Sequence, residues 1–579
     1  MLAMIVLRRI LLVGVVLVAL AAAWLWWNRP QPADMAAYVP ADAIIYIEAN
    51  SLTEIATGIT STDAWRALAP AAGIKTDFGR VGWWSRFAAW TGFGPADSVV
   101  LARAQVAVAV LSFDAAEEAS ETLKIIPRVA LVAETHTSES RVRAALEKLV
   151  GDFARRTYGS PRVETSQTDD TFYMTWTAPS DERRKIVAAV TESFAVVGND
   201  RSAVEACLAA RRGERPALSA DAQLEEMRAR MDARSALAFG YVPAGNAAKL
   251  LEVTALAYAG QMSVNPRTQS FIASLLPPLA NKLLGSAGWS TRVRQGAVED
   301  NYFVTLQSGL APRLAEALAP ANDATADAVQ FLPADAYQLT RYNYSEPETT
   351  WRGFNAALST QLDTLSAPFA ARFLEEALKP YGIESPREFL RAAGPELATA
   401  RLDDSGDSTV LVVGVRDREA MQTEVRKRLG AGARTVAVGA ETLIVSTDEE
   451  RGAASFVGDY LLMGRVEDLR RCLEARALAR TLATTESIKQ TPRNLFDAPP
   501  SGVFTLTDDE EPAQAFVSYF APQGSQQNGR ADALELRRVL PRRAYAATES
   551  RFIADGFERR TRSSFGNFGT LVTRFAPQR

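Results

Sequence analysis

The sequence predicts an α+β protein in which an N-terminal transmembrane helix is followed by two tandem copies of one antiparallel-sheet-plus-helices unit. Three observations support this class. A single long apolar run stands at the start of the chain. Short β-branched segments joined by tight polar turns recur with helical segments between them, which favours antiparallel sheets in an α+β arrangement. The same ordered pattern of motifs occurs twice, as in an internal repeat.

Length and composition set the first limits. A chain of 579 residues is too long for one ordinary core, so several domains are expected. Hydrophobic residues make up 47% and charged residues 23%, which is typical of a folded globular protein. The net charge of −4 provides no basic field that would attract nucleic acid, so no nucleic-acid partner is predicted.

The apolar run covers residues 10–27 and is long enough to cross a lipid bilayer. Arg8 and Arg9 precede it, which favours a cytoplasmic N-terminus and an extracytoplasmic bulk. Three tryptophans end the run, as at a membrane interface. The alternative is a signal peptide cleaved after Ala23. We therefore predict a single-pass anchor in the cytoplasmic membrane at residues 1–29 and a spacer at 30–37.

Two pairs of motifs define the repeat. Tyr38-Val-Pro-Ala-Asp-Ala43 in the first half matches Phe331-Leu-Pro-Ala-Asp-Ala336 in the second, and each precedes an apolar strand. Later, strands that end at Gly198 and Gly464 are each followed by a helix that carries a cysteine. The predicted domains are residues 38–310 and 331–579, joined by a linker at 311–330 that is rich in Ala, Asp and Pro.

The elements of the first half follow from periodicity and turn residues. Apolar residues at helical spacing predict a helix over 139–153. Residues 98–102 and 106–111 resemble a hairpin. The other predicted strands are 43–48, 129–133, 171–176, 186–190, 194–197, 235–242, 288–293 and 300–306.

The second half repeats this order. Its predicted strands are 410–415, 442–446, 460–464, 502–506, 543–548 and 551–561, and a helix is predicted over 418–429. Cys207 and Cys472 occupy corresponding helices with apolar spacing, so both are expected to be buried, reduced thiols and not a disulfide.

These motifs resemble an uncharacterised bacterial family. The resemblance is carried by the membrane anchor, the Pro-Ala-Asp-Ala strand entries, and the Gly394-Pro-Glu-Leu-Ala398 segment before a strand hairpin. That family is classed as a domain of unknown function in single-pass membrane proteins with large extracytoplasmic regions. The resemblance implies an architecture and a location. It implies no catalytic residues.

Known catalytic and metal-binding patterns are absent from the sequence. Its one histidine, His136, stands at a strand end before a helix, which is typical of a polar turn residue. Zinc sites need more His and Cys than this chain has. The acidic clusters 508–511 and 403–407 are interpreted as a helix start and a turn, with calcium binding as the alternative. We predict no catalytic residues, no cofactor and no metal, and hence a protein that is not an enzyme.

One aromatic segment is a candidate site. Trp83, Trp84, Phe87, Trp90 and Phe93 lie close together, and positions 83, 87 and 90 fall on one helical face. Burial of that face in the core is the simplest interpretation. The alternative is a face that contacts the membrane interface or an apolar ligand. The corresponding segment of the second half has no tryptophan.

Together these observations predict a non-catalytic binding or scaffold protein of the bacterial cell envelope, whose partners are the lipid bilayer and envelope proteins or an apolar ligand. The first alternative is a carrier or chaperone that encloses apolar cargo, lipid or peptide. The second is a hydrolase without a recognisable motif.

Overall fold

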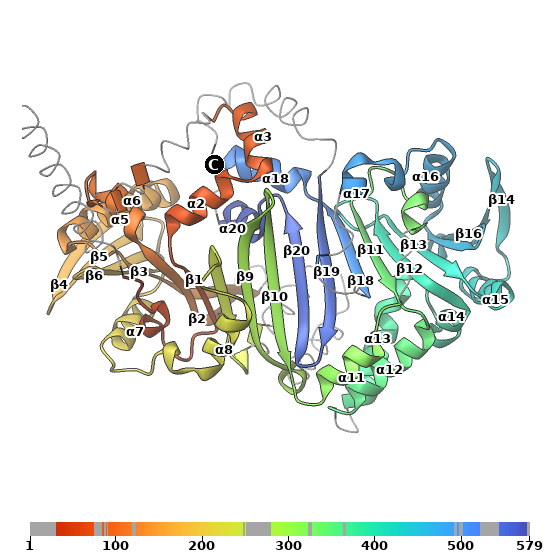
Figure 1. Ribbon diagram of the computed structural model, residues 1–579, viewed down its shortest axis with the longest axis horizontal. Helices are drawn as coiled ribbons and strands as arrows, with labels where there is room; N and C mark the ends of the chain where they lie inside the picture. Colours follow the sequence, from red (N-terminus) through yellow and green to blue (C-terminus); the bar gives the residue numbers. More distant parts are fainter. Residues whose placement is uncertain are drawn as a thin grey trace, which may run out of the picture. The chain divides into compact units, whose positions relative to one another are not determined.

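A computed structural model describes residues 31–74, 91–117, 123–246, 280–321, 327–362, 366–490, 502–520 and 544–575, with the short stretches 84–85, 88–89, 249–250 and 495–496. Contacts divide the chain into two compact units. The first comprises residues 1–60, 75–243 and 577–579, and the second comprises 61–74 and 244–576. Each unit combines antiparallel strands with packed helices, which confirms the predicted α+β class (Figure 1).

None of the helices within the described ranges is long and apolar enough to span a bilayer. The predicted anchor at residues 10–27 lies outside the described residues.

The sheet of the first unit has the strand order β8-β1-β2-β3-β7-β6-β5-β4, and every neighbouring pair is antiparallel. Its strands are β1 (Ile45–Ala49), β2 (Gln105–Glu117), β3 (Leu123–Glu134), β4 (Arg162–Thr168), β5 (Thr171–Ala178), β6 (Asp181–Thr191), β7 (Phe194–Gly198) and β8 (Ala238–Val242). Asp169 and Glu192 adopt positive φ at the β4–β5 and β6–β7 turns, where a tight hairpin requires it.

Helices cover both faces of this sheet. The helices of the unit are α2 (Leu52–Thr60), α5 (Ala96–Arg103), α6 (Glu139–Tyr158), α7 (Arg201–Arg211) and α8 (Ala222–Arg230), with the 3-10 helices η1 (Met35–Tyr38) and η2 (Leu218–Ala220). On one face, Val142 and Ala154 of α6 pack with Met174 and Trp176 of β5. On the other, α7 packs against β3 and β7.

One predicted strand of the first unit is wrong. Residues 98–102 form helix α5 instead of the first arm of a hairpin. Asp97 in its first turn and Arg103 in its last turn complement the helix dipole. Val99 and Val100 are buried on the helix, so burial in the tertiary structure outweighs the strand preference of β-branched residues.

The sheet of the second unit has the order β9-β10-β20-β19-β18-β11-β12-β13-β17-β16-β15-β14, again antiparallel throughout. Its strands are β9 (Leu284–Arg294), β10 (Ala297–Leu306), β11 (Gln338–Asn343), β12 (Ala393–Arg401), β13 (Thr409–Val415), β14 (Arg434–Val438), β15 (Glu441–Val445), β16 (Ala453–Val457), β17 (Tyr460–Gly464), β18 (Val503–Asp508), β19 (Tyr545–Ile553) and β20 (Gly556–Ser563).

The helices of the second unit are α3 (Asp63–Ala71), α11 (Leu310–Ala317), α12 (Pro347–Ser359), α13 (Ser366–Leu378), α14 (Pro386–Ala392), α15 (Arg418–Leu429), α16 (Val466–Ala477), α17 (Glu486–Gln490), α18 (Glu510–Tyr519) and α20 (Gly566–Phe575). Within the described part of the unit they are accompanied by the 3-10 helices η3 (Asp327–Phe331), η4 (Lys379–Tyr381), η5 (Glu449–Arg451) and η6 (Leu482–Thr484).

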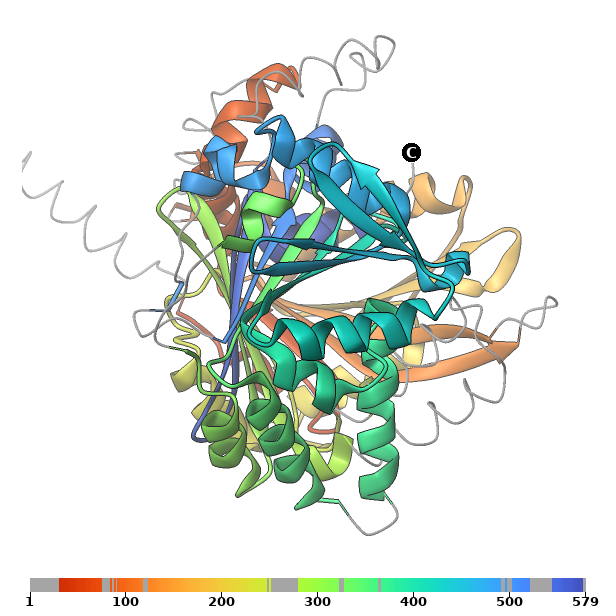
Figure 2. The same ribbon diagram turned by 90° about the vertical axis from the view of Figure 1, so that its right-hand side faces the viewer.

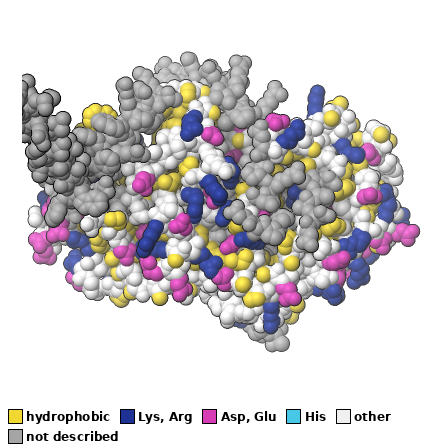
Figure 3. Space-filling model, viewed as in Figure 1, with side chains coloured by type: hydrophobic (Ala, Val, Ile, Leu, Met, Phe, Trp, Pro, Cys, Tyr) yellow, Lys and Arg dark blue, Asp and Glu magenta, His cyan; other side chains and the backbone are white. Residues whose placement is uncertain are grey.

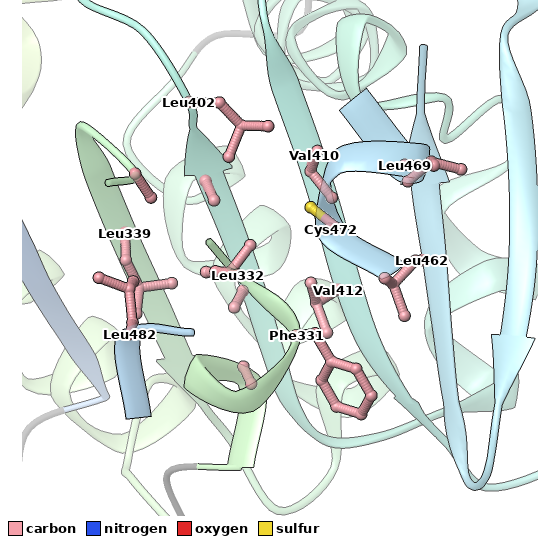
Figure 4. Close-up of a cluster of buried hydrophobic side chains, with 14 of the residues drawn as sticks. Phe331, Leu332, Leu339, Leu402, Val410, Val412, Leu462, Leu469, Cys472 and Leu482 are labelled. Carbon is pink, nitrogen blue, oxygen red and sulfur yellow. The ribbon is translucent and has the colours of Figure 1, made fainter. Parts of the chain in front are cut away.

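The side chains of β13 alternate between the two faces of the sheet and contribute to two separate cores of this unit. Val410 and Val412 face a cluster with η3, η6 and α16 (Figure 4). Leu411 and Val413 point the other way, into a cluster with α14 and α15. Figure 2 shows the cyan strands between these two groups of helices. The sheet is therefore buried on both faces at its centre.

The two cysteines lie where the sequence predicts. Cys207 is on α7, directly after β7, and Cys472 is on α16, directly after β17. Both are fully buried free thiols. Burial raises the pKa of each thiol to about 12, so neither is a reactive thiolate at neutral pH.

Candidate binding pockets

The aromatic segment of the first unit is only partly described. Trp83, Phe87 and Trp90 lie outside the described side chains. Trp84 is 60% exposed and Phe93 is 67% exposed, so these two rings are not core residues. Exposed aromatic rings of this size often mark a contact surface.

Both rings line a hollow that we call the first-unit groove, with a volume of about 720 Å³. Helix α2 contributes Leu52 and Ala56, and α5 contributes Leu101, which is 42% exposed. No described residue that lines the groove is charged. Because α2 buries none of its residues although its sequence is apolar, it presents apolar side chains to this groove.

A second hollow, the second-unit pocket, has a volume of about 330 Å³. Its floor is one face of the sheet, where Tyr342 of β11 lies opposite Leu397 of β12 and Val503 of β18. Its walls come from helices: Trp351 and Phe354 from α12, Leu378 and Tyr381 from α13 and η4, and Leu390 from α14.

Local sequence explains these positions. Pro347 is the first residue of α12, where its missing N–H costs nothing and its fixed φ suits a helix start. Trp351 and Phe354 are three positions apart and therefore share one helical face. Pro386 likewise opens α14, which directs Leu390 inward. No sequence pattern predicted this pocket, although the aromatic pair at 351 and 354 was a visible signal.

Two of the tyrosines that line the pocket lie on or next to β11. Burial raises the pKa of the Tyr342 hydroxyl. Tyr344 lies against Gly502: a Cβ added at that glycine would be 2.4 Å from Cε1 of the ring and 2.9 Å from its hydroxyl oxygen. The absent side chain at Gly502 therefore makes room for the Tyr344 ring.

A buried ionic network lies elsewhere in the first unit. Arg228 of α8 donates to both carboxylate oxygens of Glu48 at 3.0 and 2.8 Å, and to Asp34 at 3.0 Å. The Tyr46 hydroxyl donates to the same Glu48 at 2.5 Å. Arg228 also pairs with Glu225, so one guanidinium holds three carboxylates, which is typical of a structural network.

Another hollow of the first unit, of about 1310 Å³, has four arginines and six acidic residues among its described lining residues. Several of them form ion pairs with each other, such as Arg211 with Glu192. Figure 3 likewise shows Lys and Arg side chains interspersed with Asp and Glu on the visible face. The hollow and the Arg228 network both contain more acidic than basic groups, so neither offers a surplus of positive charge to an anionic ligand.

The remaining predicted positions are polar turn and cap residues. His136 has a φ of 50°, and its Nε2 is 2.9 Å from Gln105 Oε1. Burial lowers the pKa of its ring. The acidic run at 508–511 opens α18, where Asp508 accepts from the Glu510 N–H. Asp403 caps the turn at 403–407 by accepting from the Gly406 N–H. Among the described residues, no group of three or more His, Cys, Asp or Glu residues is placed to hold a metal.

Comparison with known proteins adds little to this geometry. No protein-family model matches the chain, and no curated protein matches it significantly. One solved structure that does match is titled "Structure of crystal form IV of TP0453". It is 10% identical in sequence, with a TM-score of 0.24, and the match covers 51% of this chain and 87% of the other. A similarity this low carries no argument about fold or function.

Proposed function

We propose that this protein is a membrane-anchored, extracytoplasmic binding protein of the bacterial cell envelope, and that its ligand is apolar. The observation that carries the proposal is the second-unit pocket, where aromatic and aliphatic side chains from β11, β12, α12, α13 and α14 surround about 330 Å³. Small-molecule sites are typically concave, mostly apolar and at least this large.

The chemistry of the lining favours a carrier over a scaffold. The polar groups of the described lining belong to tyrosine, threonine and tryptophan, and none is ionised at neutral pH. An unfilled apolar hollow loses packing contacts, so a ligand that fills it gains dispersion and hydrophobic energy. A scaffold surface would more often be broad and would combine an apolar centre with a polar rim.

We also propose that the two halves are copies of one ancestral unit. The order β8-β1-β2-β3-β7-β6-β5-β4 of the first half corresponds to β18-β11-β12-β13-β17-β16-β15-β14 of the second. Registers agree as well: Ala107 pairs with Val132 in one, and Ala398 pairs with Val412 in the other.

Two glycines support the same proposal. A Cβ at Gly198 would lie 2.9 Å from the carbonyl oxygen of Val129 on the neighbouring strand, and a Cβ at Gly464 would lie 2.9 Å from that of Thr409. Both positions end the strand that precedes the cysteine helix. Equal steric restrictions at equivalent places are expected if one unit was duplicated.

Duplication would make the first-unit groove the counterpart of the second-unit pocket. Each hollow lies between the helix that follows the first strand of its half and the helix that precedes the second, α2 and α5 in one case and α12 and α14 in the other. We therefore assign Trp84 and Phe93 to a ligand-contacting surface in preference to a core.

The location rests on the apolar run at residues 10–27 and the arginines before it. Protease added to spheroplasts should digest the bulk of the protein and spare the anchor. A mature N-terminus located just after Ala23 would overturn the anchor and leave a cleaved, released protein.

Binding can be tested by photolabelling. The full chain, reconstituted in lipid nanodiscs, is exposed to a ten-carbon alkane that carries a diazirine, and labelled peptides are identified by mass spectrometry. We expect labelling within 342–354 and 378–399, the segments that line the second-unit pocket.

A matched pair of variants completes the test. Leu378→Glu places a carboxylate in the pocket and should lower this labelling about tenfold or more, because an isolated charge does not tolerate apolar surroundings. Leu478→Glu alters a side chain that is 62% exposed at the end of α16 and should change nothing. Labelling confined to residues 10–27 would refute the proposed function.

A further inference from the structure

The lining of the second-unit pocket restricts the polar end of any ligand. No Lys, Arg or His is among its described residues, and no acidic residue is either. A carboxylate or phosphate buried there would lose its hydration without gaining a counter-charge, which is too costly unless the group becomes neutral. A ligand held in this pocket must therefore be uncharged where it is buried.

The pocket offers polar groups to a ligand, and the Tyr344 hydroxyl is one of them. It makes no hydrogen bond with any described residue. Burial raises the pKa of Tyr344 well above its ordinary value, so the hydroxyl stays protonated and can donate. Tyr344 is partly buried, and a ligand oxygen is a suitable partner for its hydroxyl.

The position of this hydroxyl is well defined. The Tyr344 backbone N–H donates to Pro395 O at 3.2 Å, and Gly502 lies against the tip of the ring. The neighbouring Asn343 N–H donates to Gly502 O at 2.8 Å, which ties β11 to the start of β18. These contacts hold the Tyr344 ring in the wall of a mostly apolar hollow.

We propose that the second-unit pocket binds an uncharged single-chain amphiphile, such as a long-chain alcohol or the neutral end of a monoacyl lipid, whose oxygen is hydrogen-bonded to the Tyr344 hydroxyl. This inference rests on the proposed function and specifies its ligand. A volume of about 330 Å³ is near the lower limit of ligand pockets, which favours one chain over a two-chain lipid.

Three photoreactive probes with the same ten-carbon, diazirine-bearing chain test the proposal on the full chain in nanodiscs. One ends in a hydroxyl, one in a carboxylate and one in a methyl group. At pH 8, the alcohol should label residues 342–354 and 378–399 at least about tenfold more than the carboxylate does. Lowering the pH to 5 should raise labelling by the acid and leave the alcohol unchanged, because only the acid gains a neutral form.

Two conservative variants identify the polar contact. Tyr344→Phe should reduce labelling by the alcohol about 3- to 10-fold, the effect of one lost hydrogen bond, and should not affect the alkane. Tyr342→Phe is the matched control, since it removes the hydroxyl of a neighbouring tyrosine of the same lining, and it should label as the wild type does. Neither change removes ring volume, so both variants should fold.

The outcomes separate this inference from the proposed function. If the alkane labels the pocket but the carboxylate equals the alcohol at pH 8, or Tyr344→Phe has no effect, the neutral-amphiphile proposal is wrong and the apolar site stands. If none of the three probes labels the pocket, both proposals fail.

Discussion

The carboxyl group of Asp509 should make the stability of the second unit depend on pH. Asp509 precedes α18, and its Oδ2 accepts from the Ser564 N–H at 2.6 Å. Burial raises the pKa of this carboxyl to about 6, and the adjacent Asp508 raises it further. An unfolded aspartate has a pKa of about 3.9. At a pH between these two pKa values, the carboxyl is therefore protonated in the folded state and ionised in the unfolded state.

The sign follows from this difference. Because the folded-state pKa is the higher one, the stabilisation from proton binding is fully present below about pH 4 and is lost as the pH rises through about 6. A difference of about 2 between the folded and unfolded pKa values corresponds to about 3 kcal/mol in the free energy of unfolding. The ionisation of Asp509 should therefore make the second unit less stable at pH 7.5 than at pH 4.5, by up to about 3 kcal/mol.

Asp509→Asn tests the magnitude. Asparagine keeps an oxygen that can accept from the Ser564 N–H, and it is neutral at every pH. The variant should be more stable than the wild type by about 2–3 kcal/mol at pH 7.5 and equal to it at pH 4. Urea unfolding followed by tryptophan fluorescence is a suitable assay, because Trp65 packs against Phe516 of α18.

Asp404→Asn is the control, since that aspartate lies in an exposed turn of the same unit. It should leave the pH profile unchanged. If Asp509→Asn retains the wild-type difference between pH 4.5 and 7.5, the buried carboxyl is not the titrating group and the reasoning is refuted.

Three further predictions follow from packing and charge. Cys207 and Cys472 should react with iodoacetamide at pH 8 only after unfolding, as mass spectrometry will report; fast labelling of the native chain would contradict their burial. Gly464→Ala should lower the free energy of unfolding in urea by about 1–3 kcal/mol, because the new Cβ would be 2.9 Å from a carbonyl oxygen. In the control Gly414→Ala the new Cβ meets nothing closer than 3.4 Å, so the loss should be clearly smaller. Arg228→Met should lower the free energy of unfolding by about 3–5 kcal/mol, because it leaves the buried Glu48 carboxylate without this counter-charge. An unchanged unfolding midpoint would show that Glu48 is not buried as an ion.

Local sequence was sufficient for elements whose pattern and environment agree. The helix predicted over 418–429 matches α15, and its N-cap Asp417 and terminal Gly430 are ordinary boundary signals. The two strands before the Cys207 helix were likewise predicted, because β-branched residues and a tight turn coincide there.

Elements whose local signal conflicts with their surroundings were not predictable. Helix α5 contains a Val-Val pair that is typical of a strand, and the segment is helical because of its buried position in the fold. Strand β4 is exposed along its whole length and carries polar residues, so it has no alternation to detect. It becomes a strand because β5 offers a free edge for pairing.

The sequence by itself determined the α+β class, the antiparallel pairing, and the burial of both cysteines, because each of these depends on periodicity over a few neighbouring residues. The candidate site depended on the tertiary structure. The second-unit pocket brings Tyr344 to Gly502 and sets Trp351 over strands that are tens of residues away in the chain. No local sequence pattern predicts these contacts, because side chains far apart in the sequence become neighbours only when the strand order and the helix packing bring them together. An available hydroxyl in an uncharged hollow is a property of that arrangement and not of any one segment.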